Sequence, residues 1–144
     1  MRISRLLVAL AIPVLATTAV ACGGEDDEGE GAFSADCGTL ESADPAAALP
    51  SEVPAGVSGA TFYELQTQGS TKRYFAYAEG DDVVKVRDAI RSEYQKAGYE
   101  IEGSDAEPPA EAEFEWKKGS NEGSVQVTPK CKDTVRVRYR VGSA

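Results

Sequence analysis

Histidine is absent from the sequence of 144 residues. It is the commonest general base near neutral pH, completes the usual serine and cysteine triads, and is a frequent zinc ligand. Its absence argues against these classes of catalytic and metal site. We therefore expect a protein that is not an enzyme and that binds no metal and no other cofactor.

Basic residues are also scarce. The chain carries 15 Lys and Arg against 24 Asp and Glu, a net charge of −9. Removal of an N-terminal segment containing Arg2 and Arg5 leaves 13 basic residues and a net charge of −11. An acidic surface repels the phosphate backbone, so we predict no nucleic-acid partner.

Long apolar runs are missing as well. The apolar stretch of residues 6–16 contains Pro13 and falls short of the roughly 20 residues that a membrane-spanning helix needs. The N-terminus has the three parts of an export signal: a start with two arginines, this apolar stretch, and small residues before Cys22. We predict that residues 1–21 form a signal peptide and are removed.

The junction Ala19-Val20-Ala21-Cys22, followed by two glycines, resembles the lipobox of bacterial lipoproteins. The resemblance implies that the sulfur of Cys22 receives a diacylglyceryl group and that a peptidase then cuts just before it. It also implies a protein anchored by lipid to the extracytoplasmic face of the cell membrane. The alternative is ordinary secretion, because the same residues fit an Ala-x-Ala cut.

The chain has only three cysteines. Lipidation of Cys22 leaves Cys37 and Cys131 as an even pair, whereas ordinary cleavage leaves three thiols in an oxidising compartment. A bridge between Cys37 and Cys131 would close a loop of about 94 residues, worth about 4 to 5 kcal/mol in the chain-entropy model. The alternative is two separate buried thiols.

Composition divides the mature chain into a tether and one domain. Residues 22–36 are rich in glycine and acidic side chains, which cannot bury apolar surface, so we predict a solvated tether after the lipidated cysteine. A coil of about 14 residues averages roughly 20 Å end to end, which keeps the domain near the bilayer. Residues 37–144 are long enough for a single domain.

The domain is predicted to begin with an extended lead-in and a hairpin. The lead-in, residues 44–59, carries three prolines, and we expect its Leu49, Val53 and Val57 to touch the core. Residues 61–67 and 72–78 are rich in aromatic and β-favouring side chains and flank a short polar turn.

One amphipathic helix is predicted between the acidic pair Asp81-Asp82 and Gly98. Either aspartate caps its start, and the glycine ends it. Apolar side chains follow helical spacing at Val83, Val86, Ile90, Tyr94 and Ala97. We expect the opposite face to be solvated; it carries Lys85, Arg87, Asp88, Arg91, Glu93 and Lys96. This helix ends Lys96-Ala97-Gly98-Tyr99. Together with the lead-in and the hairpin, it resembles a pattern found in small uncharacterised lipoproteins of GC-rich Gram-positive bacteria. The resemblance carries over no functional residue.

Further strands are predicted after the helix. Residues 99–102 alternate, residues 103–110 read as an acidic loop, and three clearer alternating segments follow at 113–117, 125–128 and 135–141. Such alternation is typical of an antiparallel sheet covered on one side, and the helix is available to cover it. We predict an α+β fold, a two-layer sandwich with one amphipathic helix packed on a mainly antiparallel sheet in the order β-β-α-β-β-β-β.

The most specific charged feature is the stripe Arg136, Arg138 and Arg140, three guanidinium groups on one face of a strand. It is a candidate site for a carboxylate, a phosphate or an anionic envelope polymer. The alternative is cross-strand pairing with Glu113 and Glu115, if those strands are neighbours.

Two weaker candidates remain. Glu113 and Glu115 lie about 7 Å apart on one strand face, which is compatible with a carboxylate-dependent hydrolase, although surface alternation also explains them. The second candidate is a set of aromatic side chains that could line a binding cleft; the alternative is that they pack in the core. They are Tyr63, Tyr74, Phe75, Tyr77, Tyr94 and Tyr99.

These patterns favour a lipid-anchored, non-enzymatic module that binds an envelope protein or polymer. The binding surface is either the arginine stripe or the lead-in and acidic loop. The rival hypotheses are a carrier of a small or lipid ligand, which needs an apolar cavity between helix and sheet, and a hydrolase. The sequence leaves the oligomeric state open.

Overall fold

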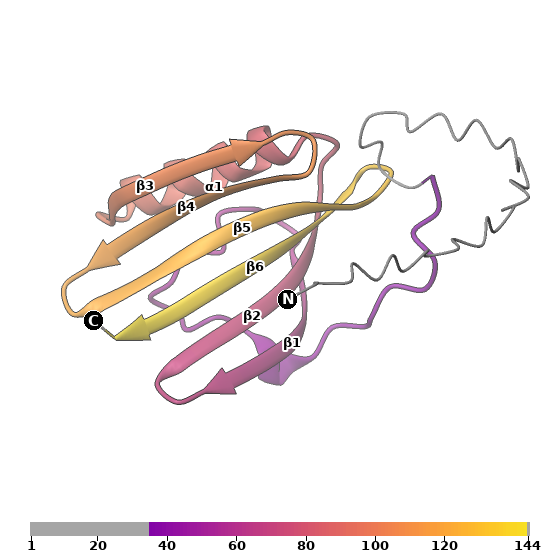
Figure 1. Ribbon diagram of the computed structural model, residues 1–144. Helices are drawn as coiled ribbons and strands as arrows, with labels where there is room; N and C mark the ends of the chain where they lie inside the picture. Colours follow the sequence, from indigo (N-terminus) through magenta and orange to yellow (C-terminus); the bar gives the residue numbers. More distant parts are fainter. Residues whose placement is uncertain (1–34, 144) are drawn as a thin grey trace, which may run out of the picture.

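The computed structural model describes residues 35–143, so the predicted signal peptide, Cys22 and most of the tether lie outside the described residues. The elements in chain order are η1 (Pro45–Ala47), β1 (Thr61–Gln68), β2 (Thr71–Glu79), α1 (Val83–Lys96), β3 (Glu100–Glu107), β4 (Glu111–Lys118), β5 (Asn121–Cys131) and β6 (Thr134–Ser143). The helix packs on one face of a six-stranded antiparallel sheet (Figure 1). The predicted α+β sandwich and its order of elements are confirmed.

The strands lie in the spatial order β1-β2-β6-β5-β4-β3. All neighbouring pairs are antiparallel. Strands β3 to β6 follow one another as a meander, and β6 then pairs with β2 of the N-terminal hairpin. The last strand of the chain is therefore central, and β5 separates it from β4.

The helix begins and ends where the sequence predicts. The carboxylate of Asp82 accepts hydrogen bonds from two backbone amides of the first turn, at 2.9 and 3.0 Å. Gly98 has φ +79°, and the amide of Tyr99 donates to the carbonyl of Tyr94 at 2.9 Å, as in a Schellman motif. Between residues 35 and 143, no helix has the length and apolar character needed to cross a bilayer.

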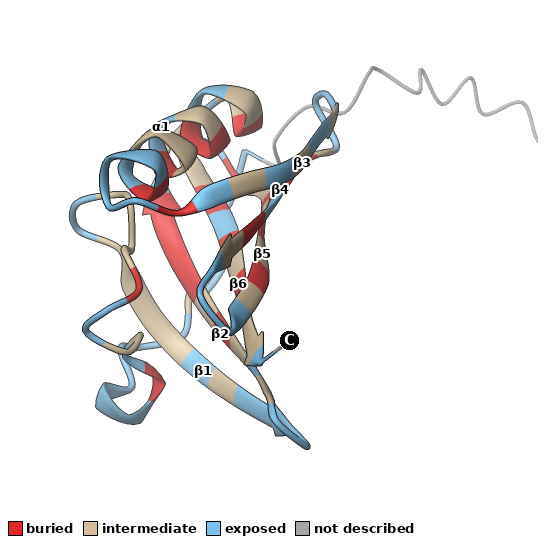
Figure 2. Ribbon diagram, turned by 90° about the vertical axis from the view of Figure 1, so that its left-hand side faces the viewer, coloured by how far each residue is buried: buried red, intermediate tan, exposed pale blue. Residues whose placement is uncertain are grey.

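Side chains fill the space between helix and sheet. Ile90 and Tyr94 of α1, Phe114 and Trp116 of β4, and Val125 of β5 are each at most 1% exposed. The ring of Tyr94 lies 5.3 Å from that of Phe114 and 5.6 Å from that of Trp116. Figure 2 shows buried residues both on α1 and on the strands of the sheet.

The lead-in covers the part of the sheet that the helix leaves open. Val53 is buried, and Leu49 and Val57 pack against the core, as the sequence predicts. The hydroxyl of Tyr139 on β6 donates to the carbonyl of Ala55 at 2.6 Å. The lead-in therefore completes the second layer beside α1.

The prediction that residues 103–110 form an acidic loop is wrong. Strand β3 continues to Glu107, and a turn with a cis Pro108-Pro109 bond leads into β4. An edge strand takes its hydrogen bonds from one neighbour and needs few apolar side chains. Only Ile101 and Ala106 of β3 pack against the core, so the apolar signal was too weak to extend the predicted strand beyond residue 102.

Candidate binding site on the open face of the sheet

Among residues 35–143, no layer covers the face of the sheet opposite α1, and we call this face the open face. On β6, Val135, Val137 and Tyr139 point into the core and are fully buried. The alternate residues of this strand lie on the open face: Arg136, Arg138 and Arg140. Arg136 and Arg140 are exposed and Arg138 is half-buried.

Strand β2 adds a fourth arginine and two rings beside this stripe. Arg73 pairs with Arg140, Phe75 with Arg138, and Tyr77 with Arg136. We call the set of these four arginines and the adjacent rings of Tyr63, Phe75 and Tyr77 the basic half of the open face. Sequence reasoning missed Arg73, although its alternation with Phe75 and Tyr77 placed it on the same strand face.

The six aromatic residues singled out from the sequence divide between the two faces. Tyr74, Tyr94 and Tyr99 are buried in the core. On the open face, the ring of Tyr63 stacks on Tyr77 with centroids 4.3 Å apart and lies 6.3 Å from Phe75. The open face therefore combines guanidinium groups with a partly exposed aromatic cluster.

The other side of the open face is mainly acidic, with Lys117 as the one basic residue of β4 on it. Glu113 and Glu115 alternate with the buried Phe114 and Trp116 on β4, and Asp105 of the edge strand pairs with Glu113. We call the following set the acidic half of the open face: Asp105, Glu107, Glu111, Glu113 and Glu115.

Strand β5 separates the two halves, and the side chains at the middle of this strand on the open face are uncharged. Gln126 pairs with Arg138 on one side and with Glu113 on the other. Ser124 in the same way pairs with both Arg140 and Glu115. The arginines and glutamates of one chain are thus about two strand spacings apart, roughly 10 Å. The cross-strand pairing considered from the sequence is excluded, because β4 and β6 are not neighbours.

None of the four arginines of the basic half forms an ion pair within 4 Å in the described part of the chain. The hydrogen bond from Tyr77 is the main cause of the lowered pKa of Glu41, and the charge of Arg136 adds to it, so Arg136 has this carboxylate as a more distant neighbour. The four ion pairs found between residues 35 and 143 all involve α1 or its N-cap. No side-chain hydrogen bond within that range involves Arg73 or the three arginines of β6. These guanidinium groups remain available to an external anion.

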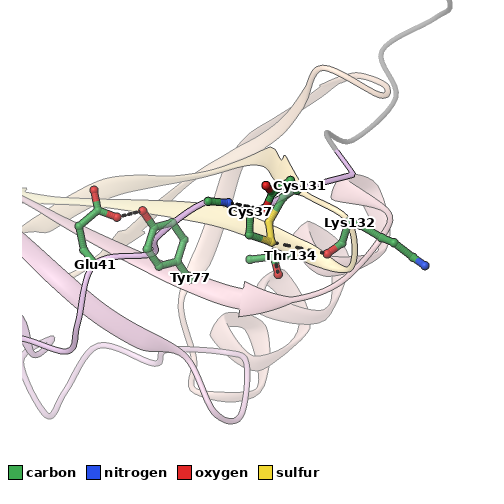
Figure 3. The surroundings of a disulfide bond; sticks show 8 residues. Cys37, Glu41, Tyr77, Cys131, Lys132 and Thr134 are labelled. Atoms are coloured by element: carbon green, nitrogen blue, oxygen red, sulfur yellow. Dashed lines mark hydrogen bonds between the residues drawn. A yellow bond between two sulfur atoms is a disulfide. The ribbon is translucent and has the colours of Figure 1, made fainter.

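A disulfide closes one end of the open face (Figure 3). Cys37 and Cys131 are bonded, as the even cysteine count suggested, and this bond joins the segment that precedes the lead-in to the end of β5. The hydroxyl of Tyr77 donates to the carboxylate of Glu41, and this hydrogen bond lowers the pKa of Glu41. Burial, with the same hydrogen bond, raises the pKa of Tyr77.

Arg87 is the one charged side chain that the structure buries among residues 35–143, with 6% exposure. Its Nη1 donates to the hydroxyl of Ser104 and to the carbonyls of Asp105 and Glu113, at 2.7, 2.8 and 3.0 Å. The prediction that Arg87 lies on a solvated helix face is wrong. The apolar stripe of α1 is narrow, and the neighbouring backbone of β3 and β4 offers acceptors to an arginine at its margin.

The structure gives little support to the other candidate sites, namely a carboxylate pair, a ligand cavity or a metal site. Glu115 is exposed and Glu113 half-buried, beside a depression of about 270 Å³ on the sheet surface. Another depression of about 390 Å³ lies between the start of α1 and the Pro108-Pro109 turn, outside the core. Among the described residues, no group of three or more Cys, Asp or Glu is arranged to hold a metal ion.

Comparisons with protein-family models, with curated proteins and with solved structures found no match for this chain. The interpretation of the open face therefore depends on its geometry and charge.

Proposed function

We propose that this protein is a membrane-anchored, non-enzymatic interaction module of the cell envelope, and that it binds through the open face of its sheet. The observation that carries the proposal is the group of four arginines that form no ion pair within 4 Å, beside the half-buried rings of Tyr63 and Phe75. Charged side chains on a protein surface are usually scattered and solvated by water. Here guanidinium groups and aromatic rings lie together on one face of the sheet. Such a set is typical of an interface rather than of a catalytic centre.

The chemistry of this surface defines the partner. A guanidinium group binds a carboxylate or phosphate through two parallel hydrogen bonds, and a ring beside it adds apolar contact. The basic half therefore fits an envelope component with regularly spaced anionic groups, either another protein surface or a polymer. The strong negative charge of the rest of the molecule disfavours binding elsewhere on its surface.

The membrane anchor is supported by two independent features. The lipobox-like sequence ends at Cys22, and the remaining two cysteines are joined in a disulfide. Disulfides persist in extracytoplasmic compartments and are rare where thiols are kept reduced. A short tether from Cys22 would then hold the disulfide end of the domain towards the bilayer.

The rival hypothesis of a ligand carrier is not favoured. A carrier needs an enclosed apolar cavity between helix and sheet. The large side chains of α1 and β4 occupy that space, with Tyr94, Phe114 and Trp116 in ring contact.

Crosslinking in living cells tests the binding face. We expect the wild-type protein to capture a specific envelope component and the variant Arg136→Ala, Arg138→Ala, Arg140→Ala to lose it. The matched control, Lys85→Ala, Lys96→Ala, Lys132→Ala, removes the same charge from exposed positions on α1 and on the β5–β6 turn, outside the basic half, and is expected to retain capture. Equal capture by the arginine variant, identified by mass spectrometry, would contradict the proposal.

The anchor is tested separately with Cys22→Ala. We expect the variant to fold and to move from the membrane fraction to the soluble fraction, because no thiol remains for lipidation. Fractionation followed by immunoblotting measures the distribution. An unchanged membrane fraction would contradict lipid anchoring and leave the binding-face test unaffected.

A further inference from the structure

The open face carries a charge pattern that is complementary to itself. We propose that it docks against the open face of a second copy of this chain, with a two-fold axis that runs parallel to the strands and lies over β5. This inference names the partner of the proposed binding face and rests on that proposal.

The sheet register aligns opposite charges at equal distances from β5. One row across the sheet contains Arg138, Gln126 and Glu113, and the next contains Arg140, Ser124 and Glu115. A two-fold rotation about an axis along β5 exchanges the two ends of each row, while every residue keeps its position along the strand direction. Strand β6 of one copy then faces β4 of the other, and each arginine meets the glutamate of its own row.

The residues nearest the axis are suited to this arrangement. A side chain on a two-fold axis faces the same side chain of its partner, so a charge there would meet a like charge. The central residues of β5 on the open face are Ser124, Gln126 and Thr128, all uncharged and half-buried. The two charged residues of β5 on this face, Glu122 and Lys130, lie near the two ends of the strand. Aligned sheets pack at roughly 30° to each other, so the ends of the two β5 strands lie further apart than their centres.

Other face-to-face arrangements lack this complementarity. An in-plane axis perpendicular to the strands would place β6 against β6 and bring Arg138 towards Arg138. The parallel axis also keeps corresponding strand ends together, so both Cys37–Cys131 ends of the dimer point the same way. Two chains anchored at Cys22 in one membrane would therefore assemble without either domain turning over.

The interface is expected to be weak in solution. From β2 to β3 the face spans four strand spacings, roughly 19 Å, which places it at the low end of stable interfaces. Attachment to a common membrane raises the effective concentration of each copy for the other. Solution measurements therefore need low salt and high protein concentration.

Charge reversal provides a test that a folding defect cannot imitate. The mature chain with Cys22→Ala is compared with two variants made in it: an acidic variant, Arg136→Glu, Arg138→Glu, Arg140→Glu, and a basic variant, Glu111→Arg, Glu113→Arg, Glu115→Arg. Each variant places like charges opposite each other in its own dimer. A mixture restores opposite charges across both pairs of facing strands.

We expect sedimentation to show a monomer–dimer equilibrium for the Cys22→Ala chain at concentrations up to about 1 mM, weakened by added salt. Each variant alone should dimerise at least about 100-fold more weakly, and the mixture should form a heterodimer. A control with Lys85→Glu, Lys96→Glu and Lys132→Glu, which shifts the net charge as the acidic variant does, should dimerise like the parent chain.

A monomeric parent chain together with a monomeric mixture would overturn the inference. If cells then still yield a different component captured through the arginines, the proposed function stands and only the identity of the partner is wrong. Conversely, a dimer that survives both charge reversals would show that self-association uses another surface.

Discussion

Gly123 illustrates how one residue on β5 depends on its surroundings. Its backbone lies against the indole of Trp116 on the neighbouring strand. A Cβ at this position would lie 2.5 Å from Cζ2 of Trp116 and 2.0 Å from the carbonyl oxygen of Arg140. The requirement for glycine here comes from space, since no positive φ is involved.

We therefore predict that Gly123→Ala lowers the free energy of unfolding by about 2 to 3 kcal/mol through overpacking. Gly103→Ala is the matched control on β3, because its Cβ would lie 3.4 Å from the flexible carboxylate of Glu115. Urea denaturation of both variants measures the difference. Equal and small effects would contradict the packing of Trp116 over Gly123.

Asp82 makes the stability of the helix start dependent on pH. Hydrogen bonds from the backbone amides of Lys85 and Val84 hold the pKa of Asp82 below its ordinary value of 3.8. Because the pKa is lower in the folded state, the ionised carboxylate contributes its full stabilisation above about pH 4. That contribution is lost as the pH falls through the folded-state pKa.

The variant Asp82→Asn keeps an acceptor for the cap and removes the charge. We predict that wild type exceeds it in stability by about 0.5 kcal/mol near pH 6, through the favourable field of the helix N-terminus. The two should converge at acidic pH, as measured by thermal unfolding. A difference that stays constant down to pH 2 would contradict the role of the carboxylate charge.

At the scale of elements, the buried guanidinium of Arg87 joins the helix to the sheet. It donates to a hydroxyl and a carbonyl of β3 and to a carbonyl of β4. The helix is thereby fixed over β3 and β4 by polar contacts as well as by its apolar stripe.

We predict that Arg87→Met lowers the free energy of unfolding by about 3 kcal/mol, because the acceptors on β3 and β4 lose their donor. Arg91→Met, one helical turn away, removes an arginine with 33% side-chain exposure that pairs with Asp88, and should cost about 0.5 kcal/mol. Chemical denaturation compares the two. Equal losses would show that burial gives Arg87 no special role.

For the whole molecule, the disulfide joins segments that are 94 residues apart in sequence. It joins the segment that precedes the lead-in to the end of β5, and the lead-in then covers part of the core. In the chain-entropy model a loop of this length contributes about 4 to 5 kcal/mol. We predict that Cys37→Ala combined with Cys131→Ala lowers the free energy of unfolding by that order, with the fold retained.

Two further observations separate this constraint from simple loss of packing. Chemical reduction of wild type should reproduce the effect of the double variant, because both release the same loop. Hydrogen exchange should become faster first in the lead-in near Ala55 and Val53, whose contacts depend on the closed loop. Unchanged stability on reduction would contradict the model.

Much of the fold follows from local pattern. The helix was predictable from the spacing of Val86, Ile90 and Tyr94 and from its two caps, and β6 from strict alternation. Only the start of strand β3 was predictable, because the rest of this edge strand carries acidic side chains and has the same composition as a loop. The burial of Arg87 was also missed, since local spacing says nothing about acceptors on strands that lie 17 to 26 residues further along the chain.

The sequence by itself determined the type of most elements, the fold class, and the face of β6 on which its arginines lie. Those properties depend on periodicity and caps, which are local. The tertiary structure alone decided that β6 lies between β2 and β5, which places Arg73 beside Arg140 and separates Arg138 from Glu113 by one strand. Alternation specifies the face of a side chain but not its neighbour, because strand order depends on packing and pairing among residues distant in sequence.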